Sequence, residues 1–253
     1  MNLYGKIGIK ILLQIMLKFN TDELIRYSRQ MLLPDVGFEG QKKLKAAKVL
    51  VVGAGGLGCP ALQYLSAAGV GTIGIIDFDK IEIHNLHRQI LYTTADVGKQ
   101  KASTAAEKIS QSNPNIRCVI FNKELHQSNA EKIISQFDIV VDGSDNFATR
   151  YLVNDVSVKL NKPLVYGTIL NFSGQFAVFN YNGSKNLRDI YPEPPNAEDV
   201  PNCDENGVMG IVPGIIGCMM CDHVLKIILG RKININTLMI FEMENYVLRK
   251  LNY

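Results

Sequence analysis

A glycine-rich stretch near the start of the chain has the spacing of a phosphate-binding loop. Residues 51–60 read VVGAGGLGCP, and Gly53, Gly55 and Gly58 fit the pattern G-x-G-x-x-G. Glycines after a strand let phosphate groups approach the backbone N–H groups that open the next helix. Asp77 follows about 20 residues later, where an acid binds a ribose hydroxyl in such sites. The pattern predicts a nucleotide site, although alone it equally fits a dinucleotide or a tight structural turn.

Basic side chains recur in short polar stretches elsewhere in the chain. They are Arg26 and Arg29 in RYSRQ, Arg88 in HNLHRQ, and Lys99 and Lys101 in GKQK. A pyrophosphate needs little beyond glycine N–H groups and a helix end, so several cations directed at one pocket favour a triphosphate. Taken singly, each of these residues is more often a solvated surface charge.

An acidic turn, DGSDN at residues 142–146, follows an apolar run that we interpret as the fourth strand. Ligands bind at the carboxyl edge of such sheets. Asp142 and Asp145 fit a Mg²⁺ site, because Mg²⁺ takes one or two carboxylates and completes its shell with water and phosphate oxygens. The structural alternative makes Asp145 the N-cap of the next helix. The two roles can coexist.

The elements that must position these residues alternate along the chain. Short apolar runs predict strands, and longer amphipathic segments predict helices. The expected strands are 48–53, 72–79, 116–122, 138–145 and 163–169, and the expected helices are 57–69, 98–113, 129–136 and 147–161. Later segments add strands at 174–181 and 237–243 and an apolar helix at 211–230. We therefore expect an α/β fold, a Rossmann-like, doubly wound, mostly parallel sheet with antiparallel C-terminal strands.

Composition excludes several classes of protein. The 253 residues are 47% apolar and carry a net charge of +3 without a basic run, which argues for a sizeable core and against nucleic acid. Five irregularly spaced cysteines favour a reducing cytoplasm. Residues 7–17 are apolar but are interrupted by Lys10 and Gln14, and they are too short to span a bilayer. We expect residues 1–20 to be an N-terminal extension and the protein to be cytoplasmic, with no membrane contact.

Several stretches together resemble one family. They are RYSRQMLLP, VLVVGAGGLGCPALQYLSAAGVG, DFD, NLHRQILY, VGKQKA, NP, DGSDNFATRYLVND and PNCDENGVMGIVPGIIG. The chain resembles the ATP-dependent activating enzymes of the ThiF, MoeB and HesA type, which are related to ubiquitin-activating enzymes. The resemblance implies one adenylation domain over residues 21–253, with a mobile crossover loop near 182–206.

The resemblance also implies roles for individual residues. Asp77 would hold the ribose, Asp145 would bind Mg²⁺, and Arg29 would reach into the active site of a partner subunit. The implied catalytic set is Arg29, Arg88, Lys101, Asp145 and Cys203. The implied nucleotide-binding set is Gly53, Gly55, Gly56, Gly58, Asp77, Asp79, Asn85, Arg88, Lys101, Asp145 and Asn146.

The reaction implied by the resemblance is the activation of a ubiquitin-like sulfur carrier protein. Its C-terminal Gly-Gly carboxylate would become an acyl-adenylate for thiamine or molybdopterin sulfur transfer. The enzyme would be a homodimer with Arg29 acting in trans, and any sulfurtransferase would be a separate chain. Three alternatives stay open: an NAD(P)-dependent oxidoreductase, activation of a peptide C-terminus, and a non-catalytic binding module. The last is disfavoured because Arg29, Arg88, Lys101 and Asp145 are all present.

The cysteines depart from the pattern of many family members, which bind zinc through two Cys-x-x-Cys pairs. The position of the first pair reads NLRD at residues 186–189, and the C-terminal VLRKLNY has no cysteine. A closed zinc site needs four ligands, so we expect no zinc. Cys218 and Cys221, within an apolar helix, favour core packing.

Cys203 differs from the other cysteines because it lies in the proline-rich loop, in PNCDENGV. In the family this is the position of a reactive cysteine that is implicated in a covalent link to the activated carrier. The adjacent Asp204 and Glu205 would raise the pKa of the thiol, which argues against a strongly activated thiolate. A covalent role and a bystander role both remain open at this point.

Overall fold

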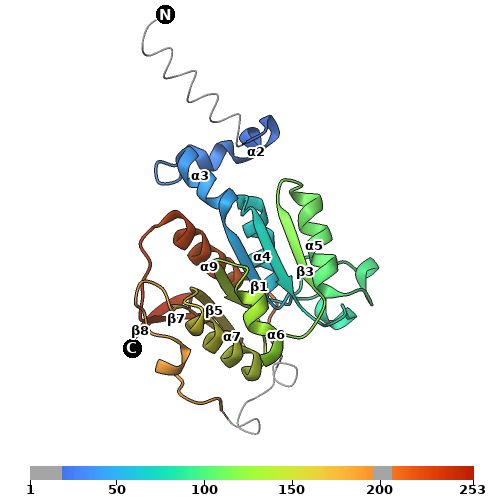
Figure 1. The fold of residues 1–253 in the computed structure, drawn as a ribbon. Helices are drawn as coiled ribbons and strands as arrows, with labels where there is room; N and C mark the ends of the chain where they lie inside the picture. The colour runs from blue at the N-terminus through green and yellow to red at the C-terminus, as the bar shows by residue number, and fades with distance from the viewer. Residues whose placement is uncertain (1–18, 196–206) are drawn as a thin grey trace, which may run out of the picture.

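The computed structural model describes residues 19–195 and 207–253, and their centre is one eight-stranded sheet (Figure 1). The spatial order of the strands is β3-β2-β1-β4-β5-β6-β7-β8. Strands β1 to β5 pair in parallel, and β6, β7 and β8 join antiparallel. The expected doubly wound fold with antiparallel C-terminal strands is therefore confirmed. The strands are β1 (Lys48–Val52), β2 (Thr72–Ile76), β3 (Arg117–Phe121), β4 (Ile139–Asp142), β5 (Leu164–Leu170), β6 (Ser173–Phe179), β7 (Thr237–Glu242) and β8 (Val247–Asn252).

Helices cover both faces of the sheet, and α2 and α3 lie together at one end of the molecule (Figure 1). Side chains of α4, α5 and α9 form the apolar layer on one face, and those of α6 and α7 form the layer on the other. The helices are α2 (Thr21–Met31), α3 (Gly37–Ala46), α4 (Gly58–Ala68), α5 (Lys101–Ser112), α6 (Gln127–Ile134), α7 (Phe147–Lys159) and α9 (Ile211–Leu229). Short 3-10 helices η1 (Ile83–Asn85), η2 (Thr94–Asp96) and η3 (Leu187–Asp189) lie in the loops.

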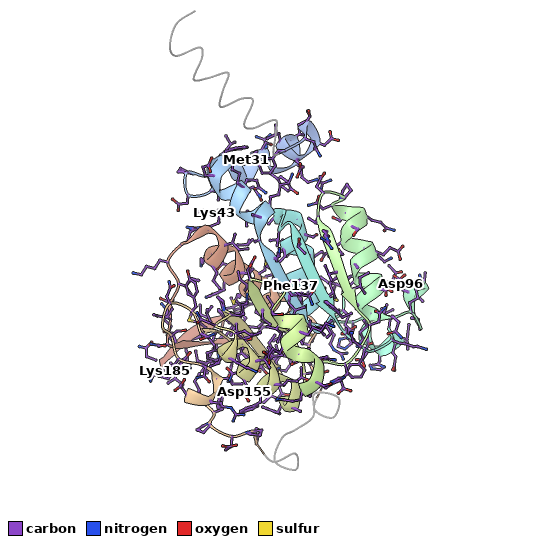
Figure 2. The ribbon with its side chains drawn as sticks, in the orientation of Figure 1. Met31, Lys43, Asp96, Phe137, Asp155 and Lys185 are labelled. Atoms are coloured by element: carbon purple, nitrogen blue, oxygen red, sulfur yellow. The ribbon has the colours of Figure 1, made fainter. Side chains whose placement is uncertain are left out.

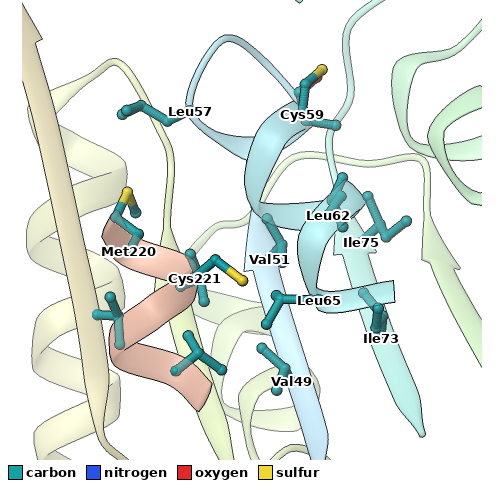
Figure 3. Packing of buried hydrophobic residues seen from close by; sticks show 14 of the residues in the cluster. Val49, Val51, Leu57, Cys59, Leu62, Leu65, Ile73, Ile75, Met220 and Cys221 are labelled. Carbon is teal, nitrogen blue, oxygen red and sulfur yellow. The ribbon is translucent and has the colours of Figure 1, made fainter. Parts of the chain in front are cut away.

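Strand β1 lies in the middle of the core and divides its side chains between the two layers. Val49 and Val51 belong to the layer beneath α4 and α9, whereas Leu50 and Val52 belong to the layer beneath α6 and α7. This follows from the two-residue period of a strand. Helices α4 and α9 pack side by side over β1 (Figure 3). Each fully buried aliphatic side chain contributes roughly 1.5–3 kcal/mol.

Helix α9 buries one face of its apolar side chains in this packing. It is the one helix in the described part of the chain that is long and apolar enough to cross a membrane by length and composition. Val212, Ile216, Met220 and Val224 recur every four residues along it and are fully buried. The helix contacts α4, β5 and β6, so in this fold it is a core helix.

Several boundaries differ from the sequence-based prediction. The expected strands 72–79 and 138–145 end at Ile76 and Asp142, because their polar continuations leave the sheet as loops. The stretch 182–195 of the expected crossover loop contains η3, and residues 196–206 are outside the described part. Helices α2 and α3 and strand β8 were not predicted.

Candidate functional site

The loops that follow β1, β2 and β4 meet at the carboxyl edge of the sheet. Val52, the last residue of β1, pairs with Ile76 and with Asp142, the last residues of its two neighbours. Gly53 has a φ of +85°, and a Cβ there would lie 2.8 Å from the carbonyl oxygen of Gly143. The glycine loop and the acidic turn are therefore in direct contact, and a larger residue at Gly53 would separate them.

Asp77 holds the glycine loop from the side of β2. Its Oδ2 accepts a hydrogen bond from the backbone N–H of Ala54 at 2.8 Å, and its Oδ1 accepts one from the N–H of Asp79 at 2.9 Å. Burial raises the pKa of Asp77, and the nearby Lys101 opposes that rise. Lys101 is only 6% exposed, and its Nζ donates to Asp79 Oδ2 at 2.8 Å. The structure thus brings Asp77, Asp79 and Lys101 together beside the loop.

The other side of the loop is open at Gly55 and closely bordered at Gly56. Among the described residues, no side chain caps the first turn of α4. A Cβ placed at Gly55 would have Gln89 Nε2 as its nearest neighbour, at 3.7 Å, whereas one placed at Gly56 would lie 3.1 Å from Pro213 Cβ and 3.5 Å from Arg88 Cγ. Uncapped N–H groups beside the space at Gly55 fit a phosphate group.

Gln89 is a candidate residue that the sequence reasoning missed. It is 3% exposed, and its Oε1 finds no hydrogen-bond partner within residues 19–195 and 207–253. Buried polar atoms without a partner are uncommon in folded proteins. Gln89 directly follows Arg88 in HNLHRQ, but nothing in the sequence distinguishes a buried amide from a solvated one.

Asn85 and Arg88 are placed by η1 at the border of the same region. Asn85 is 5% exposed, and its Oδ1 accepts a hydrogen bond from the N–H of Glu82 at 3.1 Å. Arg88 Nη1 donates to the carbonyl oxygen of His84 at 3.2 Å and lies 2.9 Å from His87 Nε2. Desolvation, followed by the charge of Arg88, lowers the pKa of His87.

The acidic turn corrects two expectations. Asp142 is fully buried, and its Oδ1 accepts hydrogen bonds from the N–H and the hydroxyl of Ser144 at 3.0 and 2.6 Å. Burial raises the pKa of Asp142. Asp142 is thus part of the turn's framework and not an accessible magnesium ligand. The N-cap of α7 is Asn146, whose Oδ1 accepts from the N–H of Thr149 at 2.8 Å, so Asp145 does not cap the helix.

Asp145 is exposed on the turn that contacts the glycine loop. The described residues contain no group of three or more His, Cys, Asp or Glu side chains that could hold a metal ion. Mg²⁺ commonly binds through one or two carboxylates together with phosphate oxygens and waters. A single accessible carboxylate beside an open phosphate loop fits Mg²⁺ that arrives with a nucleotide.

Of the other predicted cations, Arg29 lies away from the glycine loop, and Arg26 and Lys99 make other contacts. Arg29 is exposed on the last turn of α2, and the neighbouring Gln30 Nε2 donates to the carbonyl oxygen of Ala68 at 2.9 Å. Ala68 ends α4, whereas the glycine loop begins it, so the length of α4, about 16 Å, separates them. The other two are engaged: Arg26 Nη1 donates to Ser112 O at 2.9 Å, and Lys99 Nζ donates to Asp96 Oδ1 at 2.9 Å. Met31 marks the α2 end of the molecule (Figure 2).

Four cysteines can be described, and Cys203 lies outside the described residues. Cys59 and Cys221 are buried, and burial raises the pKa of the Cys59 thiol to about 12. Both therefore belong to the core, as expected for Cys221. Cys118 and Cys218 are partly buried. These environments favour the unreactive thiol form.

Residues 186–189, where zinc-binding family members have their first cysteine pair, are used in other contacts. Asn186 Oδ1 accepts a hydrogen bond from the N–H of Arg188 at 2.9 Å, and Asp189 Oδ2 accepts one from the N–H of Asn186 at 2.7 Å. Arg188 forms an ion pair with Asp155 of α7 at 2.8 Å. Polar contacts thus fix this segment to α7, and the absence of zinc stays a prediction.

Solved structures share the fold. A crystal structure of PaaA superposes with a TM-score of 0.80 at 22% sequence identity, covering 93% of this chain and 75% of that one. The structure of Escherichia coli MccB with ATP gives a TM-score of 0.79 at 23% identity, covering 90% of this chain and 71% of that one. At these identities the similarity establishes the architecture alone.

Sequence comparisons identify closer relatives. The sulfur carrier protein adenylyltransferase of Thermus thermophilus is 50% identical over 219 residues, which are 85% of this chain and 81% of that protein. The adenylyltransferase and sulfurtransferase MOCS3 of Danio rerio is 48% identical over 220 residues, which are 87% of this chain but 48% of that protein. The probable adenylyltransferase/sulfurtransferase MoeZ of Mycobacterium tuberculosis is 49% identical over 213 residues, 83% of this chain and 54% of that protein. This chain thus spans about half the length of MOCS3 and MoeZ.

The family assignment rests on most of the chain and not on the glycine loop alone. The ThiF family matches residues 27–252, from α2 through the last residue of β8. That range includes every described candidate residue discussed above except Arg26. The protein therefore belongs to the ThiF family.

Proposed function

We propose that this protein is an ATP-dependent adenylyltransferase that activates the C-terminal Gly-Gly carboxylate of a ubiquitin-like sulfur carrier protein. The observation that carries the proposal is the convergence of an open glycine loop, Lys101, Arg88 and the turn bearing Asp145 at one edge of the sheet. The relationship to a sulfur carrier protein adenylyltransferase at 50% identity supports the substrate class. The route served would be thiamine or molybdopterin sulfur transfer, in the cytosol.

The proposed reaction needs alignment and charge stabilisation more than acid–base chemistry. A carboxylate oxygen of the carrier attacks the α-phosphorus of ATP, the new O–P bond forms, and the bond to the bridging oxygen breaks to release pyrophosphate. The nucleophile is already ionised at neutral pH, so no general base is required. The loop N–H groups, Arg88 and Lys101 would orient the phosphates and stabilise the developing charge.

Asp145 would hold Mg²⁺, which supplies further neutralisation of the phosphate oxygens when it is bound with the nucleotide. Asp77 and Asn85 would face the ribose side of the site. Adenylation uses no thiol, so we assign Cys203 to a step after the adenylate forms.

We also propose that the active form is a homodimer in which Arg29 acts on the partner's site. The support is the position of Arg29 on α2, beyond the far end of α4 from its own glycine loop. A two-fold symmetric pair that places each α2 against the partner's carboxyl edge would complete both sites at once.

The test is exchange of labelled pyrophosphate into ATP by the purified full chain. Exchange should require Mg²⁺ and a carrier protein ending in Gly-Gly, and it should be lost with the same carrier lacking those two glycines. Exchange driven equally well by a short free peptide would favour peptide activation. Tight NAD(P) binding without any carrier-dependent exchange would favour the oxidoreductase alternative.

A further inference from the structure

A buried arginine lies directly beneath the turn that carries Asp145. Arg150, on the first turns of α7, is only 5% exposed. Its Nη2 donates to the carbonyl oxygen of Ser144 at 2.6 Å, and its Nη1 donates to the carbonyl oxygen of Gly167 at 2.7 Å. The guanidinium also lies 5.1 Å from the centre of the Tyr166 ring. Arg150 therefore connects the turn to β5, the neighbouring strand.

Asp142 holds the same serine from the other side. Its Oδ1 accepts a hydrogen bond from the N–H of Ser144, and the carbonyl oxygen of Ser144 accepts one from Arg150. The carbonyl of Ser144 and the N–H of Asp145 belong to one planar peptide unit. Asn146, the next residue, is fixed as the N-cap of α7. Asp145 thus lies between two residues that hydrogen bonds hold in place, and its own carboxylate is exposed.

Burying the two charges beneath the turn costs more free energy than a structural connection between the turn and β5 requires. Asp142 Oδ2 lies 3.8 Å from Arg150 Nη1 and has no hydrogen-bond partner within the described residues. Burying a guanidinium and a carboxylate costs several kcal/mol, which imperfect pairing does not fully offset. Arrangements of this kind recur where a ligand must be held in one orientation.

We propose that Arg150, with Asp142 as its buried counter-charge, is a positioning residue that directs the Asp145 carboxylate toward the metal of a bound metal–nucleotide complex. The inference rests on the proposed function, because it takes Asp145 as the metal ligand. Arg150 itself touches neither metal nor nucleotide in this assignment. Its effect passes through the Ser144 carbonyl to the orientation of Asp145.

A second arginine, Arg188 in η3, contacts the same helix and provides a control of the same residue type. Arg188 forms two hydrogen bonds of 2.8 Å with Asp155 of α7 and lies 4.8 Å from the centre of the Tyr151 ring. The residue types match those around Arg150, an arginine with an aspartate and a tyrosine, but the Arg188 side chain is 39% exposed whereas that of Arg150 is 6% exposed. Arg188 donates to Pro192 O instead of to the acidic turn, and Asp155 lies in the body of the helix (Figure 2). Its loss therefore measures a purely structural effect.

The experiment compares Arg150→Gln, Arg150→Lys and Arg188→Gln in the full chain. Mn²⁺ serves as the metal probe, and its binding is measured by electron paramagnetic resonance in the presence of the non-hydrolysable ATP analogue AMPCPP. AMPCPP affinity without metal and the melting temperature are measured beside it. We expect Arg150→Gln to weaken Mn²⁺ binding by about tenfold or more, with metal-free AMPCPP binding nearly unchanged. Arg188→Gln should lower the melting temperature and leave Mn²⁺ binding unchanged.

Arg150→Lys decides the matter should Arg150→Gln not fold. Lysine keeps the charge but cannot reach two carbonyl oxygens in the fork geometry of a guanidinium, so Mn²⁺ binding should still weaken. Unchanged Mn²⁺ affinity in a folded Arg150 variant, or no Mn²⁺ binding by the wild-type complex with AMPCPP, overturns the inference. Failure of the proposed function looks different: carrier-dependent exchange would be missing from the wild type although Mn²⁺ binding still depended on Arg150.

Discussion

The two ends of α4 meet polar environments of opposite kinds. At its C-terminal end, beneath α2, Asn113 is fully buried, and its Nδ2 donates to the Tyr27 hydroxyl at 2.8 Å and to the Ser66 carbonyl at 2.6 Å. At its N-terminal end, Gln89 Oε1 and Asp142 Oδ2 are buried without hydrogen-bond partners among the described residues. We call these regions the α2 contact and the ligand edge.

The difference indicates what each region is built for. Buried polar groups that satisfy one another hold elements together, whereas buried groups without partners reduce stability unless something else binds them. The α2 contact is satisfied among the described residues, whereas the ligand edge keeps two buried polar atoms without a hydrogen-bond partner there. Substitutions should therefore affect activity at one end of α4 and stability at the other.

The largest effect is expected at the exposed carboxylate of the ligand edge. Asp145→Asn should reduce carrier-dependent exchange by roughly a thousandfold, some 4 kcal/mol of barrier, because an amide is a poor Mg²⁺ ligand. The melting temperature should hardly change, since Asn146 and not Asp145 caps α7. Asp155→Asn makes the same chemical change on α7 and should keep full exchange. Near-normal turnover by a folded Asp145→Asn enzyme would remove Asp145 from the site.

The second effect tests whether the two regions meet across a dimer. Arg29→Ala should reduce exchange by about a hundredfold, some 2.7 kcal/mol. A heterodimer of Arg29→Ala and Asp145→Asn chains, purified through two different tags, contains one complete site and should recover about half of the wild-type activity. Arg29 acting on its own chain predicts no recovery in that heterodimer, and this result would reject the trans arrangement.

The sequence predicted those strands and helices whose burial produces a pattern of apolar residues. Strands β1 and β4 are continuous apolar runs, whereas β8 has five exposed residues and pairs only at the sheet's edge, which leaves no core pattern to detect. Helix α2 buries only Glu23 and Tyr27 of its eleven residues. Elements whose positions are decided by a few tertiary contacts could not be predicted from periodicity.

The candidate site shows the same limit. Gly53 and Asp77 could be predicted because their spacing reflects local strand–loop–helix geometry. The part played by Asp142 could not, because it depends on Arg150, whose second hydrogen bond goes to β5. The choice of Asn146 over Asp145 as N-cap is a shift of one residue, which is within the uncertainty of any helix boundary.

The α2 contact should respond with stability instead of activity. Asn113→Ala removes donors from the Tyr27 hydroxyl and the Ser66 carbonyl and should lower the free energy of unfolding by about 2 kcal/mol, measured by urea denaturation. Asn115→Ala, at a partly exposed neighbouring position, should lower the free energy of unfolding by much less. Exchange per folded molecule should fall far less than in Asp145→Asn. An equally severe loss of exchange in a stable Asn113→Ala protein would contradict the division between the two regions.

The smallest effect concerns Asp96, which precedes α5 near the ligand edge but has the fully paired character of the α2 contact. Its carboxylate accepts hydrogen bonds from Lys99 at 2.9 Å and from the N–H and hydroxyl of Thr93 at 3.0 and 2.8 Å, and it forms an ion pair with Lys108 at 2.9 Å. The contacts with Lys108 and then Lys99 hold the pKa of Asp96 well below its usual range. We therefore expect Asp96 to stabilise the fold and not to bind a ligand.

The pH dependence of stability separates this assignment from a ligand-binding role. A carboxyl whose pKa is lower in the folded than in the unfolded state stabilises the fold above its unfolded value, about 3.9, and that contribution is lost as the pH falls toward the folded pKa. At pH 7, Asp96→Asn should accordingly have a lower free energy of unfolding than the wild type. This difference should shrink as the pH falls from about 5 to 3. Asp35→Asn, which breaks an exposed ion pair with Arg231 at 3.2 Å, should have almost the same free energy of unfolding as the wild type at either pH. Urea denaturation at both pH values checks this, and a gap that widens on acidification would show that the Asp96 carboxylate is not stabilised by its lysines.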